Sequence, residues 1–323
     1  MDLDNIELEK LNISKELKII YMGTPLFSAT ILKGLLEQYK VRVIITQPDK
    51  VSDRDGKVKF SPVKTVADEH TILVLQPEKI RTDFKEILAF EPDLIITCAY
   101  GQIIPKEILD APRLGCINVH ASLLPKLRGG APIHRAILNG FSKTGITIMY
   151  MDEKMDSGDI ITQEEIEIAY DDTVETLHDK LAILGRDLLL KTLPSIINGT
   201  NERIPQEEHL VTFGYNIKRE DEHIDFSKTR KQVYNHIRGL NSHPGAYTNL
   251  DGKILKVWAS RETTNNFSNY LDGQVTAIYE DGFGVKTSNG EIVLTEVQLE
   301  GKVRVSGSAF ANGYKNLIGK VLG

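Results

Sequence analysis

The sequence predicts an N-terminal α/β domain with a doubly wound, mostly parallel (Rossmann-like) sheet, followed by a smaller β-barrel (OB-like) domain. Three observations lead to this prediction. The chain has 323 residues, and a single core rarely serves more than about 250–300 residues. Apolar strand-like runs alternate with helical patterns through its first two thirds. The last third holds short strand-like runs separated by glycine-containing turns, as in small β domains.

The elements of the first domain follow from apolar spacing. Short apolar runs predict five strands, at residues 18–22, 41–46, 94–99, 115–120 and 145–151. Apolar residues at helical spacing predict four helices between them, at residues 26–39, 62–69, 83–90 and 131–139. Thr24 suits the N-cap of the first helix and Pro25 its first helical position.

The boundary between the domains is marked by a long helix and a polar segment. Residues 171–197 predict one amphipathic helix, with Asp172 or Thr173 as its cap and Asn198-Gly199 as its stop. A further helix is expected at residues 229–240, and the short strands follow it. We therefore expect domains at residues 1–201 and 221–323, joined by a linker at residues 202–220.

Composition excludes several classes of protein. The net charge is −6, which argues against general affinity for nucleic acid, but the charge is uneven. Residues 1–209 hold 25 Lys and Arg against 33 Asp and Glu, whereas residues 210–323 hold 14 against 12. The second part could therefore present a local basic patch to an anionic partner. No apolar run is long enough to span a membrane.

Two further features bear on location and metal binding. Cys98 and Cys116 lie in apolar stretches and have no metal-ligand spacing, so we expect buried thiols, no disulfide and no metal. The first ten residues are acidic and polar, without the apolar region of a secretory signal. These features fit a cytoplasmic protein, and we expect it to be a monomer.

The segment from Gly115 to Asp159 carries the candidate chemistry. Alternation along a strand places Asn118 and His120 on one face, near the carboxyl end of the strand. Ligands of open α/β sheets bind beyond the carboxyl ends of the strands. Asp156 supplies a carboxylate from a second loop.

These three side chains suit acyl transfer to an amine. A histidine can accept the proton that an attacking amine must lose, and a carboxylate can orient the imidazole. An asparagine amide can donate to the oxyanion of a tetrahedral intermediate. Ser122 lacks the strand–elbow–helix setting of a nucleophile, which favours direct transfer without an acyl-enzyme. On residue types alone, structural roles for Asn118 and His120 are an equal alternative. Asp156 alone is a weaker signal still, because Asp-Ser-Gly is an ordinary turn sequence.

The surrounding motifs resemble those of a known family. The run NVHASLLP at residues 118–125, then Arg128-Gly129, and MDSGD at residues 155–159 are similar to the signature of 10-formyltetrahydrofolate-dependent formyltransferases. Other matches resemble the branch of that family that acts on initiator Met-tRNA. They are GTP at 23–25, QPD at 47–49, SPVK at 61–64, AYG at 99–101 and LEGK at 299–302.

The resemblance implies roles for individual residues. Asn118, His120 and Asp156 match the catalytic set of the family. The residues that match the segment bordering the folate site are Ser122, Leu123, Leu124 and Pro125.

The resemblance also implies the substrates. The formyl donor would be 10-formyltetrahydrofolate, without a metal, and the acceptor would be initiator Met-tRNA, held partly by the C-terminal domain. The loop at residues 50–59 matches a tRNA-facing insertion, in which Arg54 and Lys57 would contact the tRNA, although Asp53 and Asp55 reduce its positive charge.

Two other functions stay open at this point. A sugar-nucleotide formyltransferase would use the same catalytic set, although the match at residues 299–302 favours the tRNA branch. A non-catalytic folate-binding or RNA-binding protein on the same scaffold is the second alternative.

Overall fold

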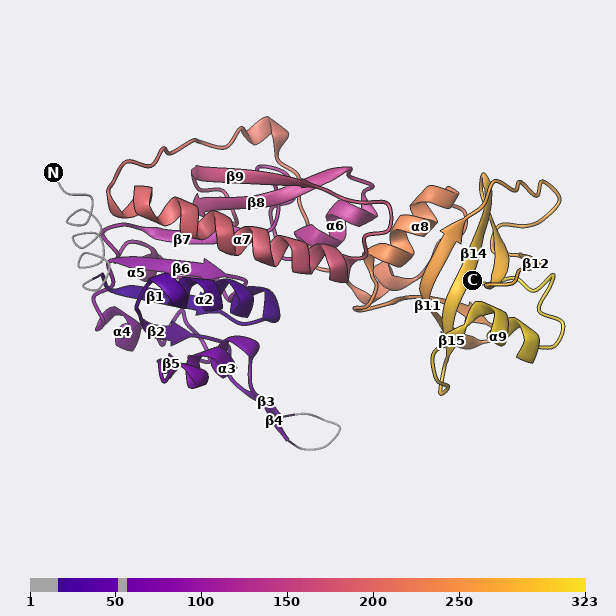
Figure 1. Ribbon diagram of the computed structural model, residues 1–323, viewed down its shortest axis with the longest axis horizontal. Helices are drawn as coiled ribbons and strands as arrows, with labels where there is room; N and C mark the ends of the chain where they lie inside the picture. The colour runs from indigo at the N-terminus through magenta and orange to yellow at the C-terminus, as the bar shows by residue number, and fades with distance from the viewer. Residues whose placement is uncertain (1–16, 52–56) are drawn as a thin grey trace. The chain divides into compact units, whose positions relative to one another are not determined.

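The computed structural model describes residues 17–51 and 57–323. The predictions for the first ten residues, for Arg54 and for the acidic residues beside it fall outside these ranges. The chain divides into two compact units (Figure 1). The first comprises residues 1–130, 145–166 and 179–213, and the second comprises residues 131–144, 167–178 and 214–323.

The first unit is built on an α/β sheet. Its strands are β1 (Ile19–Gly23), β2 (Val41–Ile45), β5 (Leu73–Leu75), β6 (Leu94–Cys98), β7 (Cys116–His120), β8 (Lys143–Tyr150) and β9 (Ile160–Glu167). Its helices are α2 (Leu26–Gln38), α3 (Pro62–Glu69), α4 (Lys85–Leu88), α5 (Lys106–Leu109) and most of α7 (Val174–Ile197), and it includes the 3-10 turn η1 (Glu208–Leu210). A separate small hairpin pairs β3 (Lys50–Val51) with β4 (Val58–Lys59).

The strand order confirms the predicted fold class. The sheet runs β5-β2-β1-β6-β7-β8-β9. Neighbours from β5 to β7 are parallel, and β8 is antiparallel to β7. The carboxyl ends of β1, β6 and β7 therefore share one edge of the sheet, where ligands of such folds bind.

Both faces of this sheet are covered, which explains why its central strands are continuous apolar runs. On one face, Ile20, Met22 and Ile95 pack in a cluster with Ile87 of α4 and Ile108 of α5. On the other face lie α2 and α7, drawn in front of the sheet in Figure 1. A Cβ at Gly185 of α7 would lie 3.2 Å from both Ile31 of α2 and Val119 of β7. Glycine there lets α7 approach the sheet closely.

Some local predictions were wrong. Pro25, not Thr24, is the N-cap of α2, and the Thr24 hydroxyl donates instead to the carbonyl of Tyr100 at 2.9 Å. The predicted helix at 83–90 forms only one turn, at Lys85–Leu88. The strands β5 and β9 were not predicted, because β5 is only three residues long and β9 carries exposed polar residues along much of its length.

The ends of the long helix agree with the prediction. The Thr173 hydroxyl accepts from the backbone N–H of Thr176 at 3.2 Å, as an N-cap does. The helix ends at Ile197, and Gly199 follows with φ of 66°, a conformation that glycine adopts without steric cost.

The second unit contains α6 (Pro132–Leu138), η2 (Arg219–Glu222), α8 (Arg230–Gly239), α9 (Gly307–Gly313) and an antiparallel sheet. The strands of that sheet are β10 (Ala246–Leu250), β11 (Lys253–Glu262), β12 (Val275–Ile278), β13 (Phe283–Thr287), β14 (Gly290–Leu299) and β15 (Val305–Ser306). Their order is β10-β11-β14-β13-β12, with β15 paired to β14. Thr229 and Gln232 form a capping box at the start of α8. The expected small β domain is thus confirmed.

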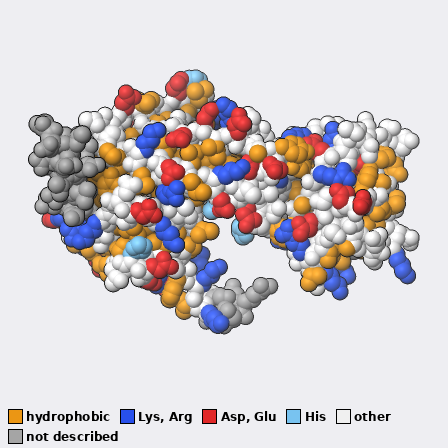
Figure 2. Space-filling model, viewed as in Figure 1, with side chains coloured by type: hydrophobic (Ala, Val, Ile, Leu, Met, Phe, Trp, Pro, Cys, Tyr) orange, Lys and Arg blue, Asp and Glu red, His pale blue; other side chains and the backbone are white. Residues whose placement is uncertain are grey.

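Surface and buried groups match the composition. On the face seen in Figure 2, Lys and Arg side chains are interspersed with Asp and Glu. Cys98 and Cys116 are buried free thiols, and burial raises the pKa of Cys98 to about 12. None of the helices in the described ranges is long and apolar enough to cross a membrane. Within the same ranges, no three His, Cys, Asp or Glu side chains gather as metal ligands would.

Candidate active site

His120 lies at the carboxyl end of β7, between two acceptors. Its side chain is buried, with an exposed fraction of 5%. Nε2 lies 3.1 Å from the carbonyl oxygen of Leu127, and Nδ1 lies 3.7 Å from Oδ2 of Asp156. A carbonyl only accepts, so Nε2 carries a hydrogen. The Leu127 carbonyl therefore fixes the tautomer of the imidazole. Asp156, the carboxylate expected to orient the ring, faces the other ring nitrogen, Nδ1.

Asn118 is two residues earlier on the same strand. Val119 packs toward α7, so alternation directs Asn118 and His120 to the opposite face. Oδ1 of Asn118 lies 2.9 Å from the hydroxyl of Thr97 on β6. Among the described residues, Nδ2 of Asn118 has no hydrogen-bond partner. The amide therefore keeps a donor for a bound group.

Asp156 sits in the loop that joins β8 to β9. A backbone hydrogen bond from Tyr150 to Asp159 closes this loop, and Oδ2 of Asp156 accepts from the backbone N–H of Gly129 at 2.8 Å. A Cβ on Gly158 would come within 2.0 Å of the Tyr150 carbonyl oxygen, so only glycine fits there. The glycine of the Asp-Ser-Gly sequence thus lets the loop pack closely against the Tyr150 backbone, and this packing positions the Asp156 carboxylate.

A half-buried polar brace, formed by Gln206 and Arg128, holds this loop in place. Nε2 of Gln206 donates to the carbonyls of Asp156 and Gly158, at 2.8 and 2.9 Å. Its Oε1 accepts from Nε of Arg128 at 3.0 Å, and Arg128 is only 5% exposed. Asp156 has φ of 50°, in the left-handed region. A residue other than glycine keeps this strained conformation only where surrounding contacts hold it, and the two hydrogen bonds from Gln206 do so here.

We expect Gln206→Ala to lower the free energy of unfolding by about 1–3 kcal/mol, because two carbonyls and a buried guanidinium lose a partner. Denaturant unfolding measures this change. Arg203→Ala is the matched control: it lies in the same segment, its ion pair with Asp159 is largely exposed, and about 1 kcal/mol or less is expected. Equal stability of the Gln206 variant and the parent would show that the brace contributes nothing.

The segment from Ser122 to Pro125 is a tightly bonded turn. The Ser122 hydroxyl donates to the carbonyl of Lys126 at 2.6 Å and is buried, which agrees with the absence of a nucleophile elbow. The backbone N–H of Leu124 donates to Thr147 at 3.1 Å, and its carbonyl accepts from Gln163 at 2.8 Å. Leu123 and Pro125 stay half-exposed. The turn can therefore shape a pocket wall.

Of the two predicted tRNA contacts, only Lys57 falls within the described residues, beside the paired strands β3 and β4. Lys57 is exposed and directly precedes β4, whereas Arg54 is outside the described residues. Val51 and Val58, which pair across the hairpin, are 65% and 56% exposed.

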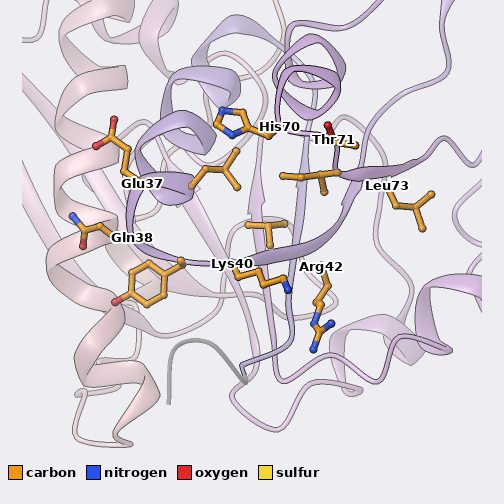
Figure 3. A pocket seen from close by; sticks show the side chains of 11 residues that line it. Glu37, Gln38, Lys40, Arg42, His70, Thr71 and Leu73 are labelled. Atoms are coloured by element: carbon orange, nitrogen blue, oxygen red, sulfur yellow. The ribbon is translucent and has the colours of Figure 1, made fainter. Parts of the chain in front are cut away.

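A polar hollow on the first unit is unrelated to this site (Figure 3). Glu37 and His70, from the ends of α2 and α3, lie on one side of it, and Lys40 and Arg42, from the start of β2, lie on the other. Because β2 is parallel to β1, this hollow is at the amino edge of the sheet, opposite the edge that carries His120.

Sequence reasoning missed three contributors to the site: Thr97, Gln206 and the Leu127 carbonyl. Thr97 had a signal, because it is a hydroxyl residue within a buried apolar strand. Gln206 had none, since it falls in a polar segment typical of a linker. A backbone carbonyl leaves no mark on a sequence at all.

Comparison with known proteins gives the family. The sequence profile of the formyl transferase family matches residues 17–193, and the profile of its C-terminal domain matches residues 216–315. A methionyl-tRNA formyltransferase of Bacillus cytotoxicus is 53% identical over 311 residues, which cover 95% of this chain and 99% of that protein. A methionyl-tRNA formyltransferase of Bacillus cereus strain B4264 has the same identity and coverage.

Solved structures share the fold at lower identity. HypX from Aquifex aeolicus, in complex with tetrahydrofolic acid, has a TM-score of 0.64 and 16% identity, over 94% of this chain and 48% of HypX. An N-formyltransferase from Helicobacter canadensis, with folinic acid and dTDP-3-aminofucose, has a TM-score of 0.65 and 23% identity, over 86% of this chain and 99% of that one. Profile and relatives together establish that this chain belongs to the formyl transferase family.

Proposed function

We propose that this protein transfers the formyl group of 10-formyltetrahydrofolate to the amino group of methionine on initiator Met-tRNA. The observation that carries the proposal is the pairing of His120 with Asp156 at the carboxyl edge of the sheet, next to an Asn118 amide whose Nδ2 has no partner among the described residues. The methionyl-tRNA formyltransferases that are 53% identical over nearly the whole chain support the choice of acceptor.

The reaction balances without a covalent enzyme intermediate. The amino nitrogen of methionine forms a bond to the formyl carbon, the bond from that carbon to N10 of the folate breaks, and one proton moves from the amine to N10. Nδ2 of Asn118 donates to the oxyanion that develops on the formyl oxygen. His120 exchanges the proton, and Asp156 faces its Nδ1 and pairs with the ring while it is charged.

The site residues fit a folate donor. The Nδ2 donor of Asn118, unpaired within residues 17–51 and 57–323, can bind a carbonyl oxygen, and the half-exposed Leu123 and Pro125 offer apolar contact for an aromatic ring. We assign Ser122, Leu123, Leu124 and Pro125 to the wall of the folate site on this basis. The transfer needs no metal, because the residues named above handle both charge and proton.

The C-terminal part is assigned to tRNA binding, with Arg54 and Lys57 as further contacts. We propose the domain limits 1–201 and 221–323, with residues 202–220 as the linker. We also propose that the protein acts as a monomer in the cytoplasm. Its net charge of −6 requires that tRNA be held by local cationic groups.

A formyl-transfer assay tests the function directly. Purified protein is incubated with 10-formyltetrahydrofolate and either charged initiator tRNA or an amino-sugar nucleotide, and the formylated product is measured. Formylmethionyl-tRNA is the expected product. Formylation of the amino-sugar nucleotide alone would identify a sugar-nucleotide formyltransferase, and folate binding without any transfer would identify a non-catalytic relative.

The dissociation constant for initiator Met-tRNA is expected to rise steeply between about 50 and 200 mM salt, because phosphate contacts release counterions. The slope of log Kd against log salt, measured by filter binding, counts those contacts. Folate affinity serves as the control and should change far less over the same range. A Kd for tRNA that does not depend on salt would contradict recognition through phosphates.

A further inference from the structure

Thr97 is a buried hydroxyl residue beside the candidate active site that the mechanism above does not use. It is 3% exposed, and it lies on β6 in direct register with Asn118 of β7. Serine and threonine are uncommon inside continuous apolar strands, because an unpaired hydroxyl there costs free energy. The hydrogen-bond partners of the Thr97 hydroxyl therefore explain why a threonine occupies this position in the strand.

The Thr97 hydroxyl is within hydrogen-bond distance of three acceptors. Oδ1 of Asn118 is nearest, at 2.9 Å, the sulfur of Met151 is at 3.0 Å, and the carbonyl oxygen of Ile117 is at 3.1 Å. A hydroxyl has one hydrogen to donate, and a thioether is a weak acceptor. The amide oxygen of Asn118 is thus the best placed strong acceptor.

The orientation of the Asn118 amide decides whether the site can stabilise an oxyanion. An amide has an oxygen end that accepts and a nitrogen end that donates, and the two ends have nearly the same shape. With the oxygen end toward the formyl group, two oxygens would face each other. With the nitrogen end toward it, the amide donates to the developing charge. Packing alone does not separate these two states, so a hydrogen bond must.

We propose that Thr97 is a positioning residue, which donates its hydroxyl proton to Oδ1 of Asn118 and so directs Nδ2 of that amide toward the formyl oxygen. This inference rests on the proposed function. It extends the candidate site from β7 to the neighbouring strand β6, because a residue of β6 would fix the orientation of the Asn118 amide. Met151 and the Ile117 carbonyl complete the surroundings of the hydroxyl without holding the amide.

The test compares Thr97→Val with Thr97→Ser. Valine keeps the branched shape but cannot donate, so kcat for Met-tRNA formylation is expected to fall about fivefold to tenfold, with KM changed less than about twofold. Serine keeps the hydroxyl and is expected to restore kcat to within about twofold of the parent. Thr97→Ala, which is smaller and fits without strain, is the second donor-free variant if valine impairs folding.

A double-mutant cycle with Asn118→Ala separates positioning from a purely structural role. If Thr97 acts through the amide, Thr97→Val has no further effect on kcat once that amide is gone. A Thr97→Val variant with parental kcat would overturn the proposal. So would a fall in kcat that persists unchanged beside Asn118→Ala, as in the alternative where the hydroxyl donates to Ile117. Parental activity of Asn118→Ala alone would instead overturn the proposed role of Asn118, and the role of Thr97 with it.

Discussion

Replacing His120 by alanine is expected to lower kcat for formyl transfer to Met-tRNA by at least about 10²-fold, with the fold intact. The imidazole is held between the Leu127 carbonyl and the Asp156 carboxylate at the carboxyl end of β7. Removing it leaves the amine without a proton acceptor. Single-turnover rates with saturating Met-tRNA measure the chemical step.

The matched control for this prediction is His70→Ala. His70 is exposed and lies at the end of α3, at the opposite edge of the sheet. Its replacement should leave kcat within about twofold of the parent. Thermal unfolding of both variants verifies that the proteins are folded. Near-normal turnover of a folded His120→Ala protein would rule out proton handling by this residue.

The second large effect is expected for Asn118→Ala, with a fall in kcat of about 10²- to 10³-fold, as when an oxyanion donor is removed. The prediction rests on the Nδ2 donor, which has no partner in the part of the chain that the structure describes, and on the position of Asn118 at the carboxyl edge, two residues from His120. Because the interaction strengthens only as charge develops, KM should change little. Steady-state kinetics with both substrates separate the effect on kcat from the effect on KM.

Asn118→Asp gives a sharper version of the same test. Aspartate has nearly the same shape as asparagine but cannot donate when ionised, and its charge opposes an oxyanion. Its kcat should be no higher than that of the alanine variant. Asn198→Ala, at the exposed end of α7, is the control for loss of an asparagine elsewhere. If Asn118→Asp keeps parental kcat, oxyanion stabilisation by this side chain is wrong.

The candidate site shows which structural features a residue pattern can predict. The pattern around Asn118 and His120 predicted both their shared strand and its place in a mostly parallel sheet, because apolar alternation and the order of elements are local properties. The catalytic roles of Asn118, His120 and Asp156 stay predictions, as do the folate-facing role of residues 122–125 and the tRNA contacts of Arg54 and Lys57. The proposed experiments decide them.

The sequence by itself determined the α/β sheet, the ends of α7, the small β domain, and the strand on which Asn118 and His120 lie. Only the tertiary structure decided which groups meet them. Thr97 precedes Asn118 by 21 residues, and Gln206 follows Asp156 by 50, yet each pair is joined by one hydrogen bond. Such pairings depend on strand register and on the path of a polar segment, which are fixed by packing across the whole sheet and not by the spacing of neighbouring residues.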